Sequence, residues 1–305
     1  MGNNEKDVRI IKEALEGDVK QIDLVSETSN RVYRVQTEKY GTIYVKFYLN
    51  KSSHIDHERH LYDFLDSKYL KEAIMISESQ NFAIYKELKG KTIDELSGDE
   101  REQYKEQIVD SLIVFYETLG KQKVDGFGLL DKDMNGTSKT FQDFIVKRQL
   151  DTEKTLEGHL LLNSAFSKIY EKYKSILIGD HSLVPIDTNA KNIMITETGE
   201  VKFIDPGELI SGPTLMGYGD FVAHTYKTEL YDCLIRKLNL SKEDMQRLRI
   251  YAVFSSLNIL AFLKKIGVSD LESVIPYGNR YTFYSLIKEH MNELGISDYT
   301  KTKKK

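Results

Sequence analysis

The spacing of hydrophobic and polar positions changes several times along residues 1–90. Apolar residues recur at helical spacing over 4–15 and again over 53–66, whereas other segments alternate as half-buried strands do. These predicted strands are residues 19–25, 32–36, 42–48, 73–77 and 82–88. Helix, three strands, helix and two strands, in this order, predict an α+β unit with an antiparallel sheet.

The pattern becomes mainly helical after residue 89. Ser97 and Glu100 form a capping-box pattern, which predicts a helix that begins there and ends near residue 119. Further segments with helical spacing are residues 140–149, 155–177, 217–238, 242–265 and 279–294. We therefore predict two domains, one with the sheet over 1–88 and one with most of the helices over 89–305.

Charge and cysteine content narrow the class of protein. The 305 residues include 43 basic and 47 acidic ones, and this acidic excess does not favour a nucleic-acid partner. The single cysteine, Cys233, excludes an intramolecular disulfide and is typical of a reducing compartment. The longest uncharged apolar run, 250–263, is too short to span a bilayer, and the N-terminus lacks a signal peptide's apolar core. We predict a cytoplasmic protein without a membrane partner.

Residues 184–208 are the only strand-like segment of the helical half, and they carry three notable polar side chains. Asp187 and Asn192 precede one short apolar run, and Asp205 follows a second one. Such residues are common in hairpin turns, and an Asp followed five positions later by Asn is by itself a weak signal. Phosphoryl transfer from a nucleotide, however, uses a carboxylate and an amide on one loop and a second carboxylate after a strand pair. The order and spacing of these three side chains match that arrangement.

The sheet half contains a matching cation. Lys46 lies in the predicted strand 42–48, and Glu58 follows it on the predicted helix 53–66. The lysine is placed like that of the Val-Ala-Ile-Lys strand of protein kinases. A helix carboxylate paired with it would hold the ammonium group toward the nucleotide phosphates. Each residue alone has an ordinary structural explanation, whereas these two together with the three of the helical half favour a phosphotransfer site.

With these residues, the chain from about 20 to 225 resembles the aminoglycoside phosphotransferase and choline kinase family of the protein-kinase-like fold. The resemblance implies a two-lobed α+β fold, with a small N-lobe of antiparallel sheet plus helix and a larger, mainly helical C-lobe. It also implies that Asp187 is the catalytic residue and that Asn192 and Asp205 bind Mg²⁺. Lys46, oriented by Glu58, would then hold the phosphates of ATP or GTP, which is the co-substrate.

Further segments carry the same resemblance. Residues 29–35 resemble the family's phosphate loop and second strand, which places Thr28 and Ser29 near the phosphates. Residues 85–90 resemble the hinge that binds adenine through backbone groups, and the hinge residues expected to do so are Lys86, Glu87 and Leu88. Gly126-Phe-Gly128 with 141–144 resembles a segment that precedes the catalytic loop. Gly219-Asp220 resembles a later Gly-Asp with a structural role.

The chain departs from the family's pattern before the catalytic loop. The family has His-Gly-Asp where this chain has Pro185-Ile186-Asp187. That histidine is mainly a scaffold residue, so the chemistry is expected to survive its loss. The loop at 26–30 also lacks glycine, so the hydroxyls of Thr28 and Ser29 and nearby backbone amides are expected to meet phosphate. No Ala-Pro-Glu element follows Asp205, which disfavours a protein substrate.

The predicted acceptor is a hydroxyl group on a small molecule, with a cationic aminoglycoside, as in antibiotic resistance, the leading candidate. Carboxylates that could attract it near the expected pocket are Glu153, Glu157, Glu208, Glu229 and Asp232. Choline, ethanolamine or a sugar are alternatives, since solvated helix faces give the same acidic pattern and 19 tyrosines could supply an aromatic cage. A catalytically idle member that binds nucleotide without turnover is a further alternative, which the altered Pro-Ile-Asp motif supports.

Overall fold

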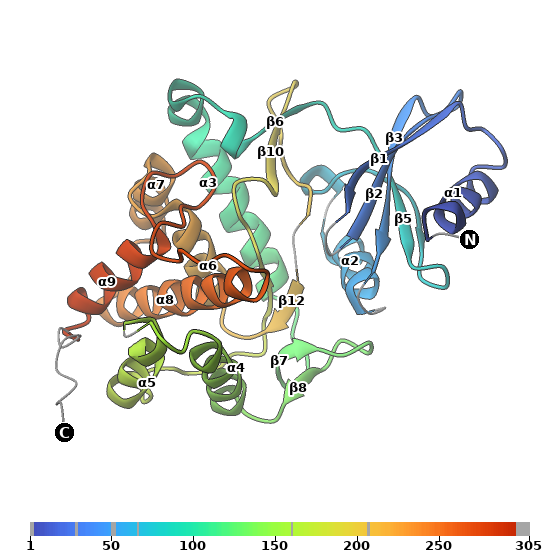
Figure 1. Cartoon of the computed structure of the whole chain (residues 1–305). Coiled ribbons are helices and arrows are strands. Elements are labelled where there is room, and N and C mark those ends of the chain that lie inside the picture. Colours follow the sequence, from blue (N-terminus) through green and yellow to red (C-terminus); the bar gives the residue numbers. More distant parts are fainter. Residues whose placement is uncertain are drawn as a thin grey trace.

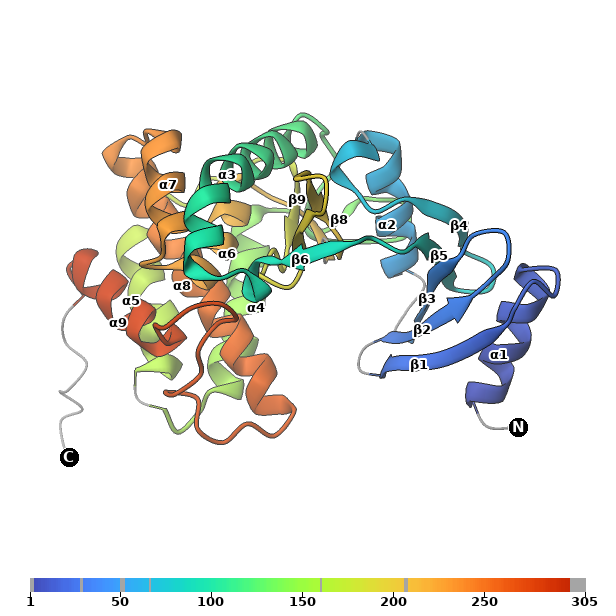
Figure 2. The same cartoon turned by 90° about the horizontal axis from the view of Figure 1, so that it is seen from above.

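The computed structural model describes residues 3–27, 30–49, 53–65, 67–159, 161–205 and 208–296. A five-stranded antiparallel sheet lies at one end of the molecule and a group of helices at the other (Figures 1 and 2). The predicted fold class, a small sheet-containing part and a larger helical part, is therefore confirmed. The division of the chain at residue 88 stays a prediction.

The N-terminal sheet has the strand order β1-β2-β3-β5-β4, and each neighbouring pair is antiparallel. Its strands are β1 (Gln21–Glu27), β2 (Asn30–Gln36), β3 (Thr42–Tyr48), β4 (Ala73–Ser77) and β5 (Phe82–Lys86). The first strand begins two residues later than predicted. The N–H of Val19 donates to the carbonyl of Gly17 at 2.8 Å, so the chain is still turning there.

Two helices pack against this sheet. Helix α1 (Asn3–Ala14) contributes Ile11 to a core shared with Val35 and Ile43 of the sheet. Helix α2 (Ser53–Phe64) lies on the side that faces the helical part (Figure 2), and its Leu61 belongs to the core of that part. The second helix therefore connects the sheet with the rest of the molecule.

The chain that leaves the sheet becomes a strand beside the predicted catalytic hairpin. Strand β6 (Gly90–Thr92) pairs with β10 (Ile193–Thr196), and β10 pairs with β11 (Val201–Phe203). The two backbones approach so closely that a Cβ at Gly90 would lie 2.1 Å from the carbonyl oxygen of Ile195. Glycine is needed here because any larger residue would push the two strands apart.

The larger part is built around helix α8 (Lys242–Lys265), whose middle is buried and which packs against α4, α5, α6 and α9. The helices around it are α3 (Gly98–Gly120), α4 (Phe141–Thr155), α5 (Leu162–Tyr173), α6 (Leu215–Thr225), α7 (Glu229–Leu238) and α9 (Phe283–Glu293). Short 3₁₀ turns are η1 (Ser67–Tyr69) and η2 (Ile93–Glu95). The predicted capping box is present, with Ser97 and Glu100 exchanging hydrogen bonds. Among the described residues, no helix is long and apolar enough to cross a membrane.

Two segments predicted as single helices differ in the structure: the helix within 155–177 begins only at Leu162, and the segment 217–238 is divided into two helices. Within 155–177, α4 ends at Thr155 and α5 begins at Leu162, and Gly158 in the turn has a φ of +97°. Within 217–238, α6 ends at Thr225 and α7 begins at Glu229, because Lys227 adopts a φ of +58° that no α-helix allows. The apolar spacing continues across both breaks, so periodicity alone does not reveal them.

The prediction that 184–208 is the only strand-like segment of this half is wrong. A four-stranded sheet lies beneath the catalytic loop, in the order β8-β7-β12-β9. Its strands are β7 (Phe127–Leu130), β8 (Gly136–Ser138), β9 (Leu183–Ile186) and β12 (Glu208–Ser211). Strands of three or four residues are too short for alternation to identify them.

A buried ion pair fastens α1 to the sheet and gives a test of the fold. Arg31 donates to both carboxylate oxygens of Asp7, at 2.6 and 3.1 Å, and both side chains are buried. Asp7→Ala removes the hydrogen-bonded partner of the buried guanidinium and leaves only the exposed carboxylate of Glu27, 3.8 Å away, so we expect the free energy of unfolding to fall by about 3–5 kcal/mol. Glu13→Ala, which removes an exposed pair with Arg9, is the control and should cost less than about 1 kcal/mol in urea unfolding. Equal losses in the two variants would contradict this account.

Candidate active site

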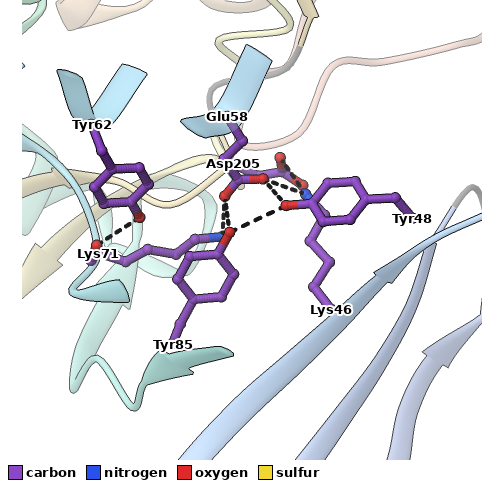
Figure 3. Close-up of polar contacts among 7 residues, drawn as sticks. All are labelled: Lys46, Tyr48, Glu58, Tyr62, Lys71, Tyr85 and Asp205. Carbon is purple, nitrogen blue, oxygen red and sulfur yellow. Dashed lines mark hydrogen bonds and ion pairs between the residues drawn. The ribbon is translucent and has the colours of Figure 1, made fainter. Parts of the chain in front are cut away.

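The predicted pair of Lys46 and Glu58 is present, between strand β3 and helix α2. The Lys46 Nζ lies 3.4 Å from Glu58 Oε2, and both side chains are buried. Strand β3 places Lys46 on the face of the sheet toward α2, and Glu58 lies on the side of α2 that faces the sheet (Figure 3). The pair predicted from the sequence is therefore in contact in the structure.

Glu58 has three further partners that the sequence did not indicate. The phenol groups of Tyr48 and Tyr85 both donate short hydrogen bonds to its carboxylate, one to each oxygen. The Lys71 ammonium lies 3.2 Å from Glu58 Oε1 and 3.7 Å from the centre of the Tyr85 ring. Figure 3 shows the two lysines reaching the carboxylate from different elements. One carboxylate thus has four charged or hydrogen-bonding neighbours.

These neighbours determine the charge of the buried network. Burial alone would raise the pKa of Glu58, but Lys46, Lys71 and the two phenols together hold that pKa well below its usual range. Burial lowers the pKa of Lys46, yet the nearby carboxylates outweigh it and hold that pKa above its usual value. The lysine and the glutamate are both charged at neutral pH.

Lys46 also contacts the third predicted residue, Asp205, which follows β11. The Lys46 Nζ lies 3.0 Å from Asp205 Oδ1, although the two residues are 159 positions apart. The Asp205 side chain is 46% exposed, so its carboxylate faces solvent as well as the lysine. The sheet-containing part and the helical part therefore contact each other here through charged groups. A site that binds nucleotide phosphates uses a cation and metal-binding carboxylates of this kind. The turn predicted at Pro206-Gly207 lies outside the described residues.

Asp187 begins the loop after β9, with a φ of 79° that non-glycine residues rarely adopt. The amide of Asn189 donates to Asp187 Oδ1 at 2.6 Å, and that of Asn192 donates to the Asp187 carbonyl at 2.7 Å. The N–H of Ile204 donates to the carbonyl of Asn192 at 2.9 Å, which joins this loop to the residue before Asp205. The three predicted polar residues therefore lie on one hydrogen-bonded hairpin.

Asp220 on α6 holds the unusual backbone of this loop in place. Its Oδ2 accepts hydrogen bonds from the N–H groups of Asp187 and Thr188, at 2.8 and 2.9 Å. Its Oδ1 accepts from the Ser255 hydroxyl at 2.5 Å. Tyr116 contacts the Thr188 hydroxyl at 2.7 Å from below. A buried carboxylate with this many donors fixes the conformation of the loop.

The environment of Asp187 changes its acidity. Burial, followed by the nearby charges of Asp220 and Asp205, raises the pKa of Asp187 to about 7, although the Asn189 amide opposes this. The carboxyl remains accessible from the cavity beside it. An accessible carboxylate with a pKa near neutrality is suited to accept a hydrogen bond or a proton from a bound hydroxyl group.

A cavity of about 490 Å³ opens beside Asp187, between the catalytic loop and the helices. Its walls come from α4, α6, α8 and the segment before α9. Such a volume is typical of pockets that enclose small organic molecules, about 300–1,000 Å³. The cavity places a bound molecule within reach of Asp187.

Five further residues were predicted to contact the nucleotide, two in the phosphate loop and three in the hinge, and the structure describes only the hinge residues. Thr28 and Ser29 lie outside the described residues. The N–H of Lys86 donates to the Glu72 carbonyl, and that of Glu87 to the Thr42 carbonyl. Leu88 is the one of the three hinge residues whose N–H has no hydrogen bond within the described part of the chain. The nucleobase-binding role of these three residues stays a prediction.

The oxygen atoms of Asn192 and Asp205 fit the ligand preference of Mg²⁺. Within the described ranges, no three His, Cys, Asp or Glu side chains cluster as a metal cage. Mg²⁺ in nucleotide enzymes uses one or two protein oxygens, with phosphates and water completing its shell. The amide nitrogen of Asn192 is used within the loop, so its side-chain oxygen and the exposed carboxylate of Asp205 are the two protein oxygens that could form such a pair.

Solved structures of phosphotransferases resemble this chain in fold. A thermostable mutant of aminoglycoside phosphotransferase APH(4)-Ia, in ternary complex with AMP-PNP and hygromycin B, matches with a TM-score of 0.71 and 16% identity, covering 95% of this chain and 97% of that one. Choline kinase LicA from Streptococcus pneumoniae matches with a TM-score of 0.64 and 12% identity, covering 94% and 99%. A choline/ethanolamine kinase family protein from Mesorhizobium loti matches with a TM-score of 0.63 and 13% identity, covering 96% and 97%.

The chain has the fold of these phosphotransferases. No protein-family model and no curated protein sequence matches it, so the likeness lies in the fold. The resemblance suggested by Lys46, Glu58, Asp187, Asn192 and Asp205 is confirmed at this level. The roles of the individual residues stay predictions.

The two phenols that donate to Glu58 offer a test of the buried network. Tyr48→Phe and Tyr85→Phe each remove one hydrogen bond to an ionised, buried carboxylate, so we expect each to lower the free energy of unfolding by about 1.5–3 kcal/mol. Tyr44→Phe, on the same strand as Tyr48, is the matched control, because its hydroxyl has no hydrogen bond among the described residues. Its effect should stay within about 0.5 kcal/mol in urea unfolding. If all three variants unfold alike, the phenols do not stabilise Glu58.

Proposed function

We propose that this protein is a nucleotide-dependent phosphotransferase that moves the γ-phosphoryl group of ATP or GTP to a hydroxyl group of a small molecule. The observation that carries the proposal is the position of Lys46 between Glu58 and Asp205, 3.4 and 3.0 Å from their carboxylates. The catalytic loop with Asp187 and Asn192 lies directly beside this contact through the Ile204–Asn192 hydrogen bond. The kinase fold of the structural neighbours, one of them with AMP-PNP bound, supports this proposal.

Each group has a defined part in the proposed transfer. The oxygen of the acceptor hydroxyl forms a bond to the γ-phosphorus, and the bond from that phosphorus to the β,γ-bridging oxygen breaks. Asp187 accepts the hydrogen bond from the attacking hydroxyl, aligns it and takes up its proton, which then passes to solvent. Lys46 holds the α- and β-phosphates, and Glu58 orients it. Nothing is oxidised or reduced.

Asn192 and Asp205 would hold Mg²⁺ in this site. When bound, the cation neutralises charge on the phosphates of the donor. The Lys46 ammonium and the proposed metal-binding carboxylate of Asp205 are in direct contact. We expect turnover to depend on a divalent cation for this reason.

An aminoglycoside remains the acceptor predicted from the sequence, and the hygromycin B complex of one structural neighbour supports it. The five carboxylates thought to attract such a polycation, however, do not line the cavity beside Asp187. Glu229 pairs with Arg101 at 2.8 Å, and Glu153 accepts hydrogen bonds from Ser167. These acidic residues therefore give little support to a cationic acceptor, and a cytoplasmic location stays a prediction as well.

Removal of the Asp187 carboxylate tests the proposed chemistry. We expect Asp187→Ala to lower kcat by about 10²–10⁴-fold, because the acceptor hydroxyl loses the group that aligns and deprotonates it. Nucleotide affinity should change little, since Asp187 does not contact Lys46 or Asp205. Asp23→Ala, on the exposed strand β1, is the control and should keep full turnover. A variant at Asp187 with near-normal kcat would contradict the assignment.

The acidity of Asp187 predicts how activity depends on pH. Its pKa is raised to about 7, so the carboxyl gains a proton as the pH falls through that value and no longer accepts from the acceptor hydroxyl. We expect kcat/KM to fall about tenfold per pH unit below neutrality and to level off above it. Steady-state rates between about pH 5 and 9, with circular dichroism as a control for folding, measure this limb. A profile that stays flat down to pH 5 would show that Asp187 does not titrate there.

A further inference from the structure

The cavity beside Asp187 is lined mainly by apolar side chains. Residues from α8 and from the segment before α9 form most of its walls, and among them are Phe254, Ile259, Leu263, Val274, Pro276 and Phe283. Such a lining binds the apolar body of a ligand by removing it from water. A polycation with a hydroxyl or amine on nearly every carbon would lose its hydration here without finding partners.

The mouth of the cavity is apolar as well. Phe262, Ile275 and Tyr277 line it and are 60%, 50% and 53% exposed. Several exposed large apolar side chains that adjoin one cavity are typical of a binding surface rather than of ordinary protein surface. The apolar region therefore extends from the interior to solvent. Such a region suits a ligand with an apolar body longer than the two-carbon chain that joins the nitrogen and the hydroxyl group in choline or ethanolamine.

The charges in the cavity wall do not favour a cation. The two carboxylates of the lining are Asp187 and Asp220, and the second is already occupied by the loop N–H groups and Ser255. The one basic side chain that lines the cavity is Arg148 on α4, whose guanidinium has no hydrogen bond or ion pair within the described residues. It stacks near the Phe144 ring, at 5.9 Å. The carboxylates of Glu208 and Asp220 act on this guanidinium electrostatically, but neither forms an ion pair with it. A half-buried guanidinium whose N–H groups have no hydrogen-bond acceptor among the described residues favours an oxygen acceptor on the ligand.

Two further lining residues carry buried polar atoms without partners. Both ring nitrogens of His224 and the amide oxygen of Gln149 lack hydrogen bonds in the part of the chain that the structure describes. Burial lowers the pKa of His224, so the ring is neutral at physiological pH. These groups suit neutral oxygen or hydroxyl functions of a ligand, and they offer no negative charge to a cationic one.

We propose that the acceptor is an alcohol with a large apolar body and a carboxylate or carbonyl oxygen that pairs with Arg148, and that it carries no cationic group. The inference rests on the proposed phosphotransferase activity, because that activity makes the cavity beside Asp187 the acceptor site. Apolar contact with the α8 wall supplies affinity, Arg148 fixes the orientation, and the hydroxyl end meets Asp187. The phosphoryl transfer itself is the one described above.

Three alcohols of equal chain length test the proposal: ω-hydroxydodecanoate, dodecane-α,ω-diol and ω-aminododecanol. An aminoglycoside and choline complete the set, and all probes are used below their micelle concentrations. Binding is measured by calorimetry with the Mg²⁺ complex of AMP-PNP present, and transfer by mass spectrometry with ATP or GTP. We expect affinity to decrease from the carboxylate to the diol to the amine, and to fall about fourfold for each methylene removed from the chain.

Arg148→Met tests whether Arg148 is the residue that makes the protein prefer a terminal carboxylate over a terminal hydroxyl or amine. We expect it to weaken ω-hydroxydodecanoate about tenfold or more, to leave the diol within about threefold, and so to remove the preference for the carboxylate. Arg148→Lys, which keeps the charge, should retain part of that preference. Arg9→Met, on the exposed face of α1, is the control and should change none of the affinities. Unchanged AMP-PNP binding shows that each variant is folded.

The outcomes separate this inference from the proposed activity. Tightest binding of ω-aminododecanol, of choline or of the aminoglycoside would overturn it, and so would an Arg148→Met variant that keeps the carboxylate preference. If only a cationic acceptor is phosphorylated, the phosphotransferase proposal stands and this inference falls. If the predicted order of binding is found but no acceptor is phosphorylated with either nucleotide, the ligand class stands and the phosphotransferase proposal falls.

Discussion

The Lys46 ammonium lies between two carboxylates, Glu58 on helix α2 and Asp205 after strand β11. Its buried position is tolerable only because both counter-charges are present, and one of them comes from the helical part of the molecule. Glu58 in turn is held by Lys71, Tyr48 and Tyr85, so its carboxylate cannot rotate away. The whole arrangement joins the sheet to the catalytic hairpin through charged groups that a nucleotide's phosphates and metal could share.

A second rigid point lies at Asp220, which binds the backbone at Asp187 and Thr188. The predicted catalytic loop is therefore held in the conformation that gives Asp187 its unusual φ. The same carboxylate contributes to the raised pKa of Asp187, because two acidic groups lie close together in a partly enclosed place. Asp220 thus fixes the conformation of the loop and also helps to raise the pKa of Asp187. The apolar cavity opens next to this loop.

Much of the candidate site could be predicted from the sequence, because its parts follow a fixed order along the chain. Lys46 and Glu58 are near in sequence, and Asp187 and Asn192 share one loop. The contact of Lys71 with Glu58 was missed, because the sequence around a lysine in a connection between a helix and a strand does not indicate which residue it contacts. The cavity lining was missed for a similar reason, since it gathers residues from α4, α6, α8 and the segment before α9, and which of their side chains face one another depends on tertiary packing. Conversely, none of the five acidic residues favoured from the sequence lines the cavity. Glu208, in strand β12 next to Ile186, comes nearest to it and acts electrostatically on Arg148.

The central claim is that the groups around Lys46 and Asp187 transfer a phosphoryl group to an alcohol. Phosphorus NMR of the protein with Mg²⁺, ATP or GTP and each acceptor in turn, namely the three long-chain alcohols, choline and an aminoglycoside, follows donor and product in one spectrum. The account predicts a new phosphate monoester signal that grows in step with the nucleoside diphosphate. A nucleotide that binds but yields diphosphate and inorganic phosphate alone, or no change at all, with every acceptor would contradict it and favour a catalytically idle nucleotide-binding protein.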